Sequence, residues 1–419
     1  MRIGWATPFN TRSAIGRFSQ VVCAEMASRG HEIDVIRIER GAELELDELP
    51  SECRITDAAS SNVDDYDALI VNFGNHAPYH AGLLDFVAQR APIAIFHDAE
   101  MRDFEWGMLQ RHGIAIPLAS GISDEQFMSD EQDLVDPSAR PLLGTLAAMS
   151  CGAVIHGPHY RQAVQAYCAG PVQDIPLCYP DLMGNRSSAK PSPGRRVVIF
   201  GVISEHKQPR RVMQAIAAAQ RQTGEIELHL AGAIEDAYRA KLISEAATLG
   251  LKAPLFHGYL PDEALQRVLD DAHAICCLRY PVTEGGSASL ITAMYSGRPL
   301  ILSDVASYSV VPDDLAYKVS YGIQIEDLSS ALMQIFDNPV DAEGRASRAR
   351  LWAADRYSAQ SYCDALEPFL LSIGPHATLA RLASRFVEAI PKPAFGSASV
   401  ALTAASEVLD WMQASQKRI

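Results

Sequence analysis

Short apolar runs alternate with segments of helical periodicity along most of the chain. This pattern predicts parallel sheets whose faces are covered by helices. Residues 2–7 predict a first buried strand, and residues 17–29 predict a helix that leads to a turn and a second strand. Residues 13–16 fall where such a βαβ unit places a ligand loop, although no G-x-G-x-x-G fingerprint is present and an ordinary turn explains them equally well. Further strands are predicted at 66–73, 92–96 and 152–156.

The stretch 184–194 is rich in Gly, Ser and Pro and is the clearest linker in the chain. The same alternation starts again after it. Strands are predicted at 197–200, 226–231, 254–257, 274–278 and 299–303, and helices at 209–221, 235–249 and 262–270. The sequence therefore predicts an α/β protein with two doubly wound domains of similar size and a cleft between them.

The domain boundaries follow from this linker. We expect a first domain at 1–183, the linker at 184–194, a second domain at 195–350 and C-terminal helices at 351–419. These last helices, with the amphipathic tail 375–419, either return to the first domain or mediate self-association. The less regular stretch 101–149 is interpreted as an insertion that forms part of an acceptor wall or a lid.

The most informative stretch, 279–304, predicts a glycine loop, a helix and a strand in quick succession. Gly285 and Gly286 let the backbone approach a ligand closely, and a serine at 287 or 289 can cap the helix that follows. A helix start behind two glycines is a natural site for phosphate. Glu284 at its rim can accept hydrogen bonds from hydroxyl groups. A phosphate beside a polyhydroxyl group describes a nucleotide sugar.

Composition narrows the class of protein. The chain has 419 residues, a hydrophobic content of 48% and a formal net charge of -15, with its basic residues scattered. These values favour full hydrophobic cores and argue against a nucleic-acid groove. The eight cysteines include no C-x-x-C pair and suggest buried thiols in a reducing compartment. No signal peptide or membrane-spanning run is recognised, so we expect a cytoplasmic protein, with peripheral contact at the inner face of the membrane left open.

Several polar residues follow predicted strand ends, where open α/β sheets bind their ligands. Asn75 and His76 follow one strand, and His97 and Asp98 close the next. We select His97 as the functional histidine, because the adjacent carboxylate of Asp98 offers to orient it. A metal site is disfavoured, because Pro78 is expected to break the helix that would align two histidines. The segment Asp65-Tyr66-Asp67 precedes a strand and is interpreted as a solvated turn.

In their order and spacing, the motifs resemble GT-B-fold glycosyltransferases, specifically the retaining glycosyl transferases group 1 (family 4-like) that carry an E-x7-E motif, and their bacterial polysaccharide subgroup. The segments that carry this resemblance are 74–80, 96–98, 200–207, 230–232, 257–261, 284–294 and 296–299. The resemblance implies two Rossmann-like domains that face a cleft, plus a C-terminal helical extension. It also implies transfer with retention at the anomeric carbon and no requirement for a cofactor or a divalent metal.

The resemblance assigns roles to individual residues. Lys207 would neutralise the donor diphosphate together with the amides of Gly285, Gly286 and Ser287. Glu284 would bind hydroxyls of the transferred sugar, and His97 would lie near the reacting centre. Gly16 would reach towards the diphosphate, and Asn75, His76 and Asp98 would line the acceptor side or the cleft. Fixed positive potential of this kind stabilises a departing diphosphate.

Two departures from the family pattern bear on the donor site. Thr292 stands where the second Glu of the E-x7-E motif grips the nucleotide ribose, so Thr292 is kept among the candidate donor residues, although a plain helix residue is the simpler interpretation. Val202 stands where an Arg is common. Arg279 or Arg210 is positioned in the sequence to replace that cation.

Three hypotheses follow. The leading one is a glycosyltransferase that moves a sugar from a nucleotide-diphosphate donor to a glycan, a lipid-linked or another cell-surface acceptor. The second is a nucleotide-sugar-binding or scaffold protein with little catalysis, which Thr292 and Val202 motivate. The third is a nicotinamide-dependent oxidoreductase, against which the missing G-x-G-x-x-G fingerprint weighs.

Overall fold

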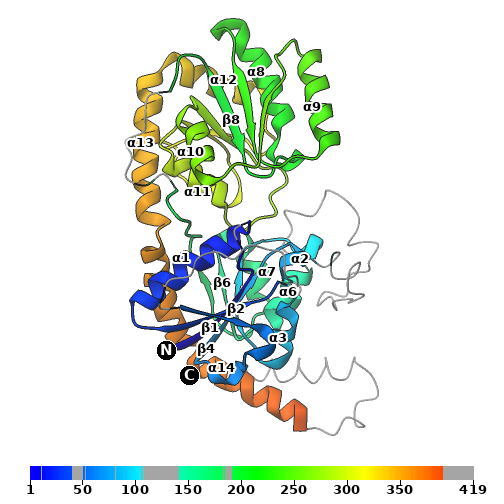
Figure 1. Ribbon diagram of the computed structural model, residues 1–419, viewed down its shortest axis with the longest axis vertical. Coiled ribbons are helices and arrows are strands. Elements are labelled where there is room, and N and C mark those ends of the chain that lie inside the picture. The colour runs from blue at the N-terminus through cyan, green and yellow to red at the C-terminus, as the bar shows by residue number, and fades with distance from the viewer. Residues whose placement is uncertain are drawn as a thin grey trace. The chain divides into compact units, whose positions relative to one another are not determined.

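The computed structural model describes residues 1–10, 12–39, 51, 53–80, 82–104, 107, 141–182, 184 and 191–389 (Figure 1). The predicted insertion 101–149, the linker 184–194 and the tail 375–419 therefore lie largely or partly outside the described residues. Contacts divide the chain into two compact units. Unit 1 comprises Met1–Pro176, Thr283–Gly286 and the chain from Tyr362 onward, and unit 2 comprises Leu177–Val282 and Ser287–Ser361.

Unit 1 is built on a seven-stranded parallel sheet with the order β3-β2-β1-β4-β5-β6-β7. Its strands are β1 (Arg2–Thr7), β2 (Glu32–Arg37), β3 (Cys53–Asp57), β4 (Ala68–Phe73), β5 (Ile93–Phe96), β6 (Gly152–Ile155) and β7 (Val172–Asp174). The five inner strands confirm the sequence prediction. The two edge strands were not predicted, because β3 is mostly half-exposed and β7 has three residues, so neither forms a long apolar run.

The helices of unit 1 pack around this sheet (Figure 1). They are α1 (Ala14–Ser28), α2 (Ala77–His80), α3 (Leu83–Gln89), α6 (Pro141–Ala148), α7 (Arg161–Gln165) and α14 (Ala359–Ala389), with short 3-10 turns η1 (Ala58–Ser60), η2 (Val63–Asp65) and η4 (Pro158–Tyr160). Helix α1 begins three residues earlier than predicted, because the Ser13 hydroxyl caps it by accepting a hydrogen bond from the Gly16 amide (3.1 Å). Residues 13–16 thus form a capped helix start.

The C-terminal helix α14 completes the core of unit 1. The Tyr362 ring packs edge-on against Phe18 of α1, with ring centroids 5.1 Å apart. The Arg29 guanidinium at the end of α1 contacts the carboxylates of Glu367 (2.7 Å) and Asp364 (2.7 Å) on α14. The first and last helices of the described chain therefore belong to one core.

Unit 2 carries a six-stranded parallel sheet with the order β10-β9-β8-β11-β12-β13. Its strands are β8 (Arg196–Phe200), β9 (Glu227–Ala231), β10 (Leu255–Gly258), β11 (Ala274–Cys277), β12 (Leu300–Ser303) and β13 (Tyr317–Val319). Its helices are α8 (Pro209–Thr223), α9 (Asp236–Thr248), α10 (Asp262–Asp270), α11 (Ala288–Tyr295), α12 (Ile325–Asp337) and α13 (Pro339–Arg356), with η5 (Glu205–Lys207) and η6 (Ala306–Tyr308). The prediction is confirmed except for the short edge strand β13.

Both sheets have the crossover order of doubly wound folds, in which ligands bind beyond the carboxyl ends of the strands. In unit 1 the order reverses between β1 and β4, and β5 is the strand after β4. In unit 2 the order reverses between β8 and β11. The loops that leave β5, β8 and β11 contain most of the candidate residues.

Candidate active site

The loop Thr283–Gly286 pairs with the chain that leaves β5, and both belong to unit 1. The Ala99 amide donates to the Thr283 carbonyl (2.8 Å), and the Gly285 amide donates to the His97 carbonyl (2.8 Å). Asp98 and Glu284 face each other between these two bonds as an isolated antiparallel bridge. In such a pair the two side chains lie on the same side and close together. Two carboxyl groups are therefore brought to one place.

Gly285 lies where only a glycine fits. A Cβ atom at this position would lie 2.3 Å from the Tyr160 hydroxyl and 2.9 Å from the His97 carbonyl oxygen. The Tyr160 hydroxyl is fixed in place, because it donates to the Phe96 carbonyl (2.7 Å) and accepts from the His156 amide (2.7 Å). The Gly285 amide, which the sequence suggested as a diphosphate ligand, has a protein acceptor in this structure.

The Asp98 carboxyl is held by its surroundings in a weakly acidic state. It accepts a hydrogen bond from the Asn75 amide (2.7 Å), which favours the ionised form. Burial, reinforced by the neighbouring carboxylates of Glu284 and Glu100, outweighs that bond and raises the pKa of Asp98 to about 7. A carboxyl with this pKa exchanges its proton near neutral pH.

Asn75 and His76 occupy different environments. The Asn75 side-chain oxygen accepts from the Phe104 amide (2.8 Å), so this residue shapes the turn after β4. His76 is exposed, and its ring packs edge-on against Tyr79 (4.5 Å between centroids). The expectation that Pro78 breaks the helix here is wrong. Pro78 lies in the first turn of α2, where proline loses no helical hydrogen bond.

His97 has two partners that the sequence did not indicate. Its Nε2 lies 3.0 Å from the Asn72 side-chain oxygen, and its Nδ1 lies 3.2 Å from Nε2 of His156. The interpretation that Asp98 orients this ring is therefore wrong, because the carboxyl of Asp98 turns to the Asn75 amide instead. Burial lowers the pKa of His97 well below its ordinary value and lowers that of His156 to about 4. His156 directly follows β6, whose residues are all apolar, so only the shared sheet edge could have pointed to it.

In unit 2, Lys207 turns inward from the loop after β8. It is 7% exposed, and its ammonium group donates to the Phe200 carbonyl (2.5 Å) at the end of that strand. Gly201 has φ near +80°, and a Cβ there would lie 3.0 Å from Lys207 Nζ. The glycine therefore allows both the left-handed turn and the close passage of the lysine. Val202 is 68% exposed and contributes no cation to this loop.

Arg279 is buried where β11 ends. Its guanidinium donates to the Leu278 carbonyl (3.0 Å) and to the Ser289 hydroxyl (3.2 Å). Ser289 lies in the first turn of α11, so this cation is fixed beside the helix start. Arg210, the other candidate to replace the missing cation, pairs instead with Glu245 of α9. Arg279 is thus the better placed of the two.

The start of α11 is capped as predicted. The Ser287 hydroxyl accepts from the Leu290 amide (3.3 Å) and from the Tyr308 hydroxyl (2.9 Å). Thr292 is 3% exposed inside the same helix. Gly16, the remaining candidate, is buried in α1, and a Cβ there would lie 3.0 Å from the Asn10 carbonyl oxygen and 3.1 Å from that of Pro8. Close packing accounts for glycine at position 16.

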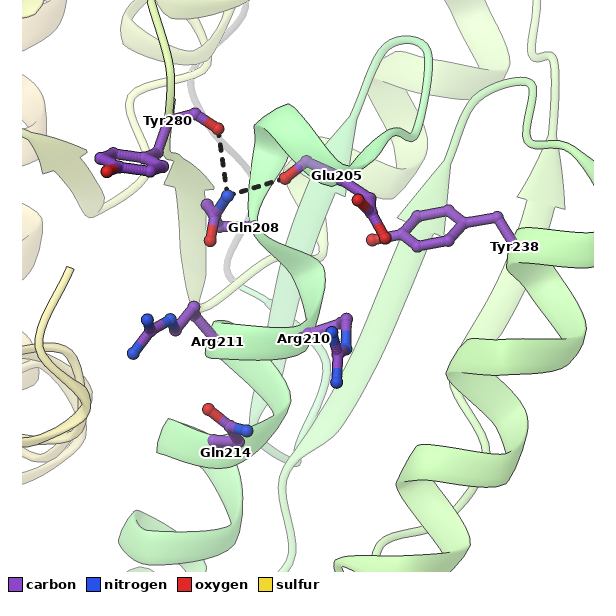
Figure 2. Close-up of a pocket in the computed structure, with 7 residues that line it drawn as sticks. All are labelled: Glu205, Gln208, Arg210, Arg211, Gln214, Tyr238 and Tyr280. Carbon is purple, nitrogen blue, oxygen red and sulfur yellow. Dashed lines mark hydrogen bonds between the residues drawn. The ribbon is translucent and has the colours of Figure 1, made fainter. Parts of the chain in front are cut away.

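A cavity of about 460 Å³ opens next to the Lys207 loop (Figure 2). It is lined by Glu205, Gln208, Arg210, Arg211, Gln214, Tyr238 and Tyr280. Figure 2 shows the Gln208 amide bridging two loops, because it donates to the carbonyls of Glu205 (2.9 Å) and Tyr280 (3.1 Å). The Gln208 side chain therefore links the loops that leave β8 and β11 at the wall of this cavity.

Comparisons with known proteins bear on one region of the sequence and on the fold. Residues 185–352 match the family model described as glycosyl transferases group 1. The fold is similar to that of Anabaena HepE in complex with UDP and glucose (TM-score 0.60, 13% identity, covering 89% of this chain and 100% of that one). It is also similar to sucrose-phosphate synthase from Thermosynechococcus elongatus (TM-score 0.58, 14% identity, 88% and 98% covered) and to WaaG, a glycosyltransferase of lipopolysaccharide biosynthesis (TM-score 0.55, 15% identity, 85% and 96% covered). A search of curated proteins finds no match.

The chain has the GT-B fold, and its residues 185–352 match the model of the glycosyl transferases group 1 family. The matched region contains Lys207, Arg279, the loop Thr283–Gly286 and α11. His97, Asp98 and His156 lie outside the matched region, in unit 1. The roles that the family resemblance gives to these residues stay predictions. None of the helices in the described residues is both long and apolar enough to cross a lipid bilayer.

Proposed function

We propose that this glycosyltransferase moves a sugar from a nucleotide-diphosphate donor to a glycan, glycolipid or other cell-surface acceptor, with retention of the anomeric configuration and without a metal ion. The observation that carries the proposal is the pair of buried cations at the switch point of unit 2. Lys207 and Arg279 lie in the loops that leave the adjacent strands β8 and β11, inside the region that matches the group 1 model. Buried cations at this edge suit a departing diphosphate.

We propose uracil as the base of the donor nucleotide. HepE is described in complex with UDP and glucose, and separately with UDP-glucose. Lys207 and Arg279 would bind the diphosphate, with the start of α11 adding its dipole. Glu284 would bind hydroxyls of the sugar. The glycan acceptor is proposed by analogy with WaaG, which acts in lipopolysaccharide biosynthesis.

Turnover of a donor panel tests this proposal. UDP-, GDP- and TDP-sugars are incubated with the protein in the presence of a metal chelator, and release of the nucleoside diphosphate is measured. We expect one donor to be consumed, and Lys207→Ala to reduce the rate about 100-fold, as losing one preorganised donor does. Lys252→Ala is the matched control, because that lysine is exposed and pairs only with Glu225 among the described residues. Equal rates for both variants would remove Lys207 from the mechanism.

One alternative has its own support. Thr292 replaces a ribose-binding carboxylate and is buried in α11, and the Gly285 amide is already bonded to His97. A nucleotide-sugar-binding or scaffold protein with little catalysis would tolerate both. This alternative predicts a higher melting temperature with UDP-sugars and no consumption of any donor in the same panel.

A further inference from the structure

A row of hydrogen bonds crosses the core of unit 1 and begins and ends on backbone carbonyls. The Asn72 side-chain amide donates to the Ala6 carbonyl (3.1 Å), and its oxygen faces Nε2 of His97 (3.0 Å). Nδ1 of His97 faces Nε2 of His156 (3.2 Å), whose Nδ1 faces the Ile175 carbonyl (3.0 Å). All three side chains are buried. The row thus runs from β1 and β4 across the ends of β5 and β6 to the residue that follows β7, beneath the loop that carries Glu284.

Counting protons shows that this row is incomplete when both imidazoles are neutral. Each of its four contacts needs one proton between the two atoms, and the carbonyl oxygens at both ends can only accept. The amide of Asn72 supplies one proton along the row, and each neutral imidazole supplies one, so three protons serve four contacts. Reversing the Asn72 amide moves the gap to its other side and supplies no fourth proton. A third proton on the His97–His156 pair fills every contact.

The surroundings keep that proton off the pair in the unliganded protein. Phe18 packs edge-on against both rings, at 4.7 Å from His97 and 5.6 Å from His156 between centroids. Burial disfavours a charge in this place and lowers the pKa of both histidines. Among the described titratable groups, His80 of α2 acts electrostatically on His97, the Tyr160 hydroxyl accepts from the His156 amide, and the Tyr362 ring of α14 packs near His156. Asp98 follows His97 in the chain and pairs with Glu284 of the loop, and its carboxyl turns to the Asn75 amide.

None of these neighbours provides the negative charge that would stabilise a protonated His97–His156 pair. The His80 ring is satisfied as a neutral donor to the Asn72 backbone carbonyl (3.1 Å), and burial lowers its pKa to about 3. Asp98 keeps a proton for much of the time at neutral pH, because its pKa is raised to about 7. An anion that arrives from outside changes this balance, since opposite charge favours the protonated imidazole. The His97 carbonyl holds the Gly285 amide, so the pair lies directly behind the loop at which we place the donor.

We propose that the His97–His156 pair takes up one proton when the nucleoside diphosphate of the donor binds, and that His156 is the positioning residue that allows His97 to carry the charge. This inference rests on the proposed function, because it needs the diphosphate to bind near the loop of Glu284. With the third proton, Nδ1 of His156 donates to Ile175 and Nε2 of His97 donates to Asn72. One proton is shared between the two rings.

Titration calorimetry with UDP tests the proposal. The binding enthalpy is measured at pH 7 in buffers of different ionisation enthalpy, so that its slope gives the number of protons taken up. We expect a slope near one proton for the native protein and an affinity that falls about tenfold for each pH unit, as long as the pH lies between the pKa of the free pair and that of the complex. We expect a slope near zero for His156→Phe, in which neutral His97 needs only its contact with Asn72. His80→Gln, which changes a buried histidine outside the row, is the matched control and keeps the native slope.

The failures are distinguishable. Binding of UDP without proton uptake overturns the inference and leaves the proposed function intact, whereas no binding of UDP, GDP or TDP overturns both. A loss of uptake in His80→Gln would also overturn the role of His156. If His156→Phe does not fold, nitrogen-15 chemical shifts of the native histidine rings decide the question. Three protonated nitrogens in the two rings are expected with UDP bound, and two protonated nitrogens would refute the proposal.

Discussion

Replacing Gly285 by alanine tests how the glycine loop is held. The new Cβ atom would lie 2.3 Å from the Tyr160 hydroxyl oxygen and 2.9 Å from the His97 carbonyl oxygen. Both distances are shorter than any ordinary contact, so either the loop or the tyrosine must move. The Tyr160 hydroxyl has two hydrogen bonds of 2.7 Å of its own, to the Phe96 carbonyl and from the His156 amide, so it resists displacement.

The size of the effect follows from these bonds. If the loop moves, the bonds from the Gly285 amide to His97 and from the Ala99 amide to Thr283 are lost. Each such bond contributes about 1 kcal/mol net, which gives a cost of about 2 kcal/mol. If the tyrosine moves instead, the buried His156 amide loses its acceptor, and the cost rises to about 3 kcal/mol. We expect the local free energy of opening to fall by about 2 to 3 kcal/mol.

Hydrogen exchange at single amides measures this change directly. A loss of about 2 kcal/mol corresponds to roughly 30-fold faster exchange of the amides of Ala99 and Gly285. Gly344→Ala in α13 is the control, because the nearest side-chain atom would lie an ordinary 3.7 Å away, and helix stability should hold or rise. Unchanged protection at both amides in Gly285→Ala would refute the reasoning.

Three further outcomes are expected. Because the pKa of Asp98 is raised to about 7, its contribution to stability is complete below its ordinary pKa of 3.8 and is lost as the pH rises through 7. The melting temperature of Asp98→Asn should therefore rise relative to that of the native protein between pH 3.8 and pH 7. Parallel curves of melting temperature against pH would contradict this. Hydrogen bonds from His31 and Arg29 lower the pKa of Glu367, so their stabilisation should disappear as the pH falls below the ordinary value of 4.5, and acid melts of Glu367→Gln should lack that step. Phe18→Ala should destabilise unit 1 by about 3 to 5 kcal/mol in a denaturant melt, because Phe18 is fully buried against His97, His156 and Tyr362, whereas a loss below 1 kcal/mol would mean that this core collapses around the gap.

The repeating pattern of the sequence was sufficient to predict the two sheets. The apolar runs of the inner strands are local signals, and so are Gly297 and Pro299, which mark the boundary between a helix and the next strand. The structure has α11 before this boundary and β12 after it. The edge strands β3 and β7 carried no such signal, because a half-exposed or very short strand forms through its pairing with the neighbouring strand and not through its own apolar pattern. Pro78 was misjudged for a related reason, since its effect depends on where the helix starts.

The site was harder to predict than the fold, because its partners are distant in the sequence. The motif around Glu284 was recognisable, but its pairing with Asp98 joins residues 186 positions apart. Nothing in the run that ends β6 marks His156 as the partner of His97. Adjacency in the sequence suggested Asp98 as that partner, whereas in the structure the neighbouring strand β6 brings His156 to His97. Lys207 was selected from the family resemblance, and Arg279 was selected because it follows the strand before the glycine loop.

The return of α14 to the first core has a consequence for biosynthesis. Unit 2 is inserted between parts of unit 1, since the chain leaves unit 1 after Pro176, returns to it briefly at Thr283–Gly286 and returns finally at Tyr362. A ribosome therefore releases all of unit 2 before the helix that covers Phe18 exists. During that interval the nascent first domain exposes the apolar surface around Phe18 that Tyr362 later covers, and exposed apolar surface of this kind makes a growing chain prone to aggregation.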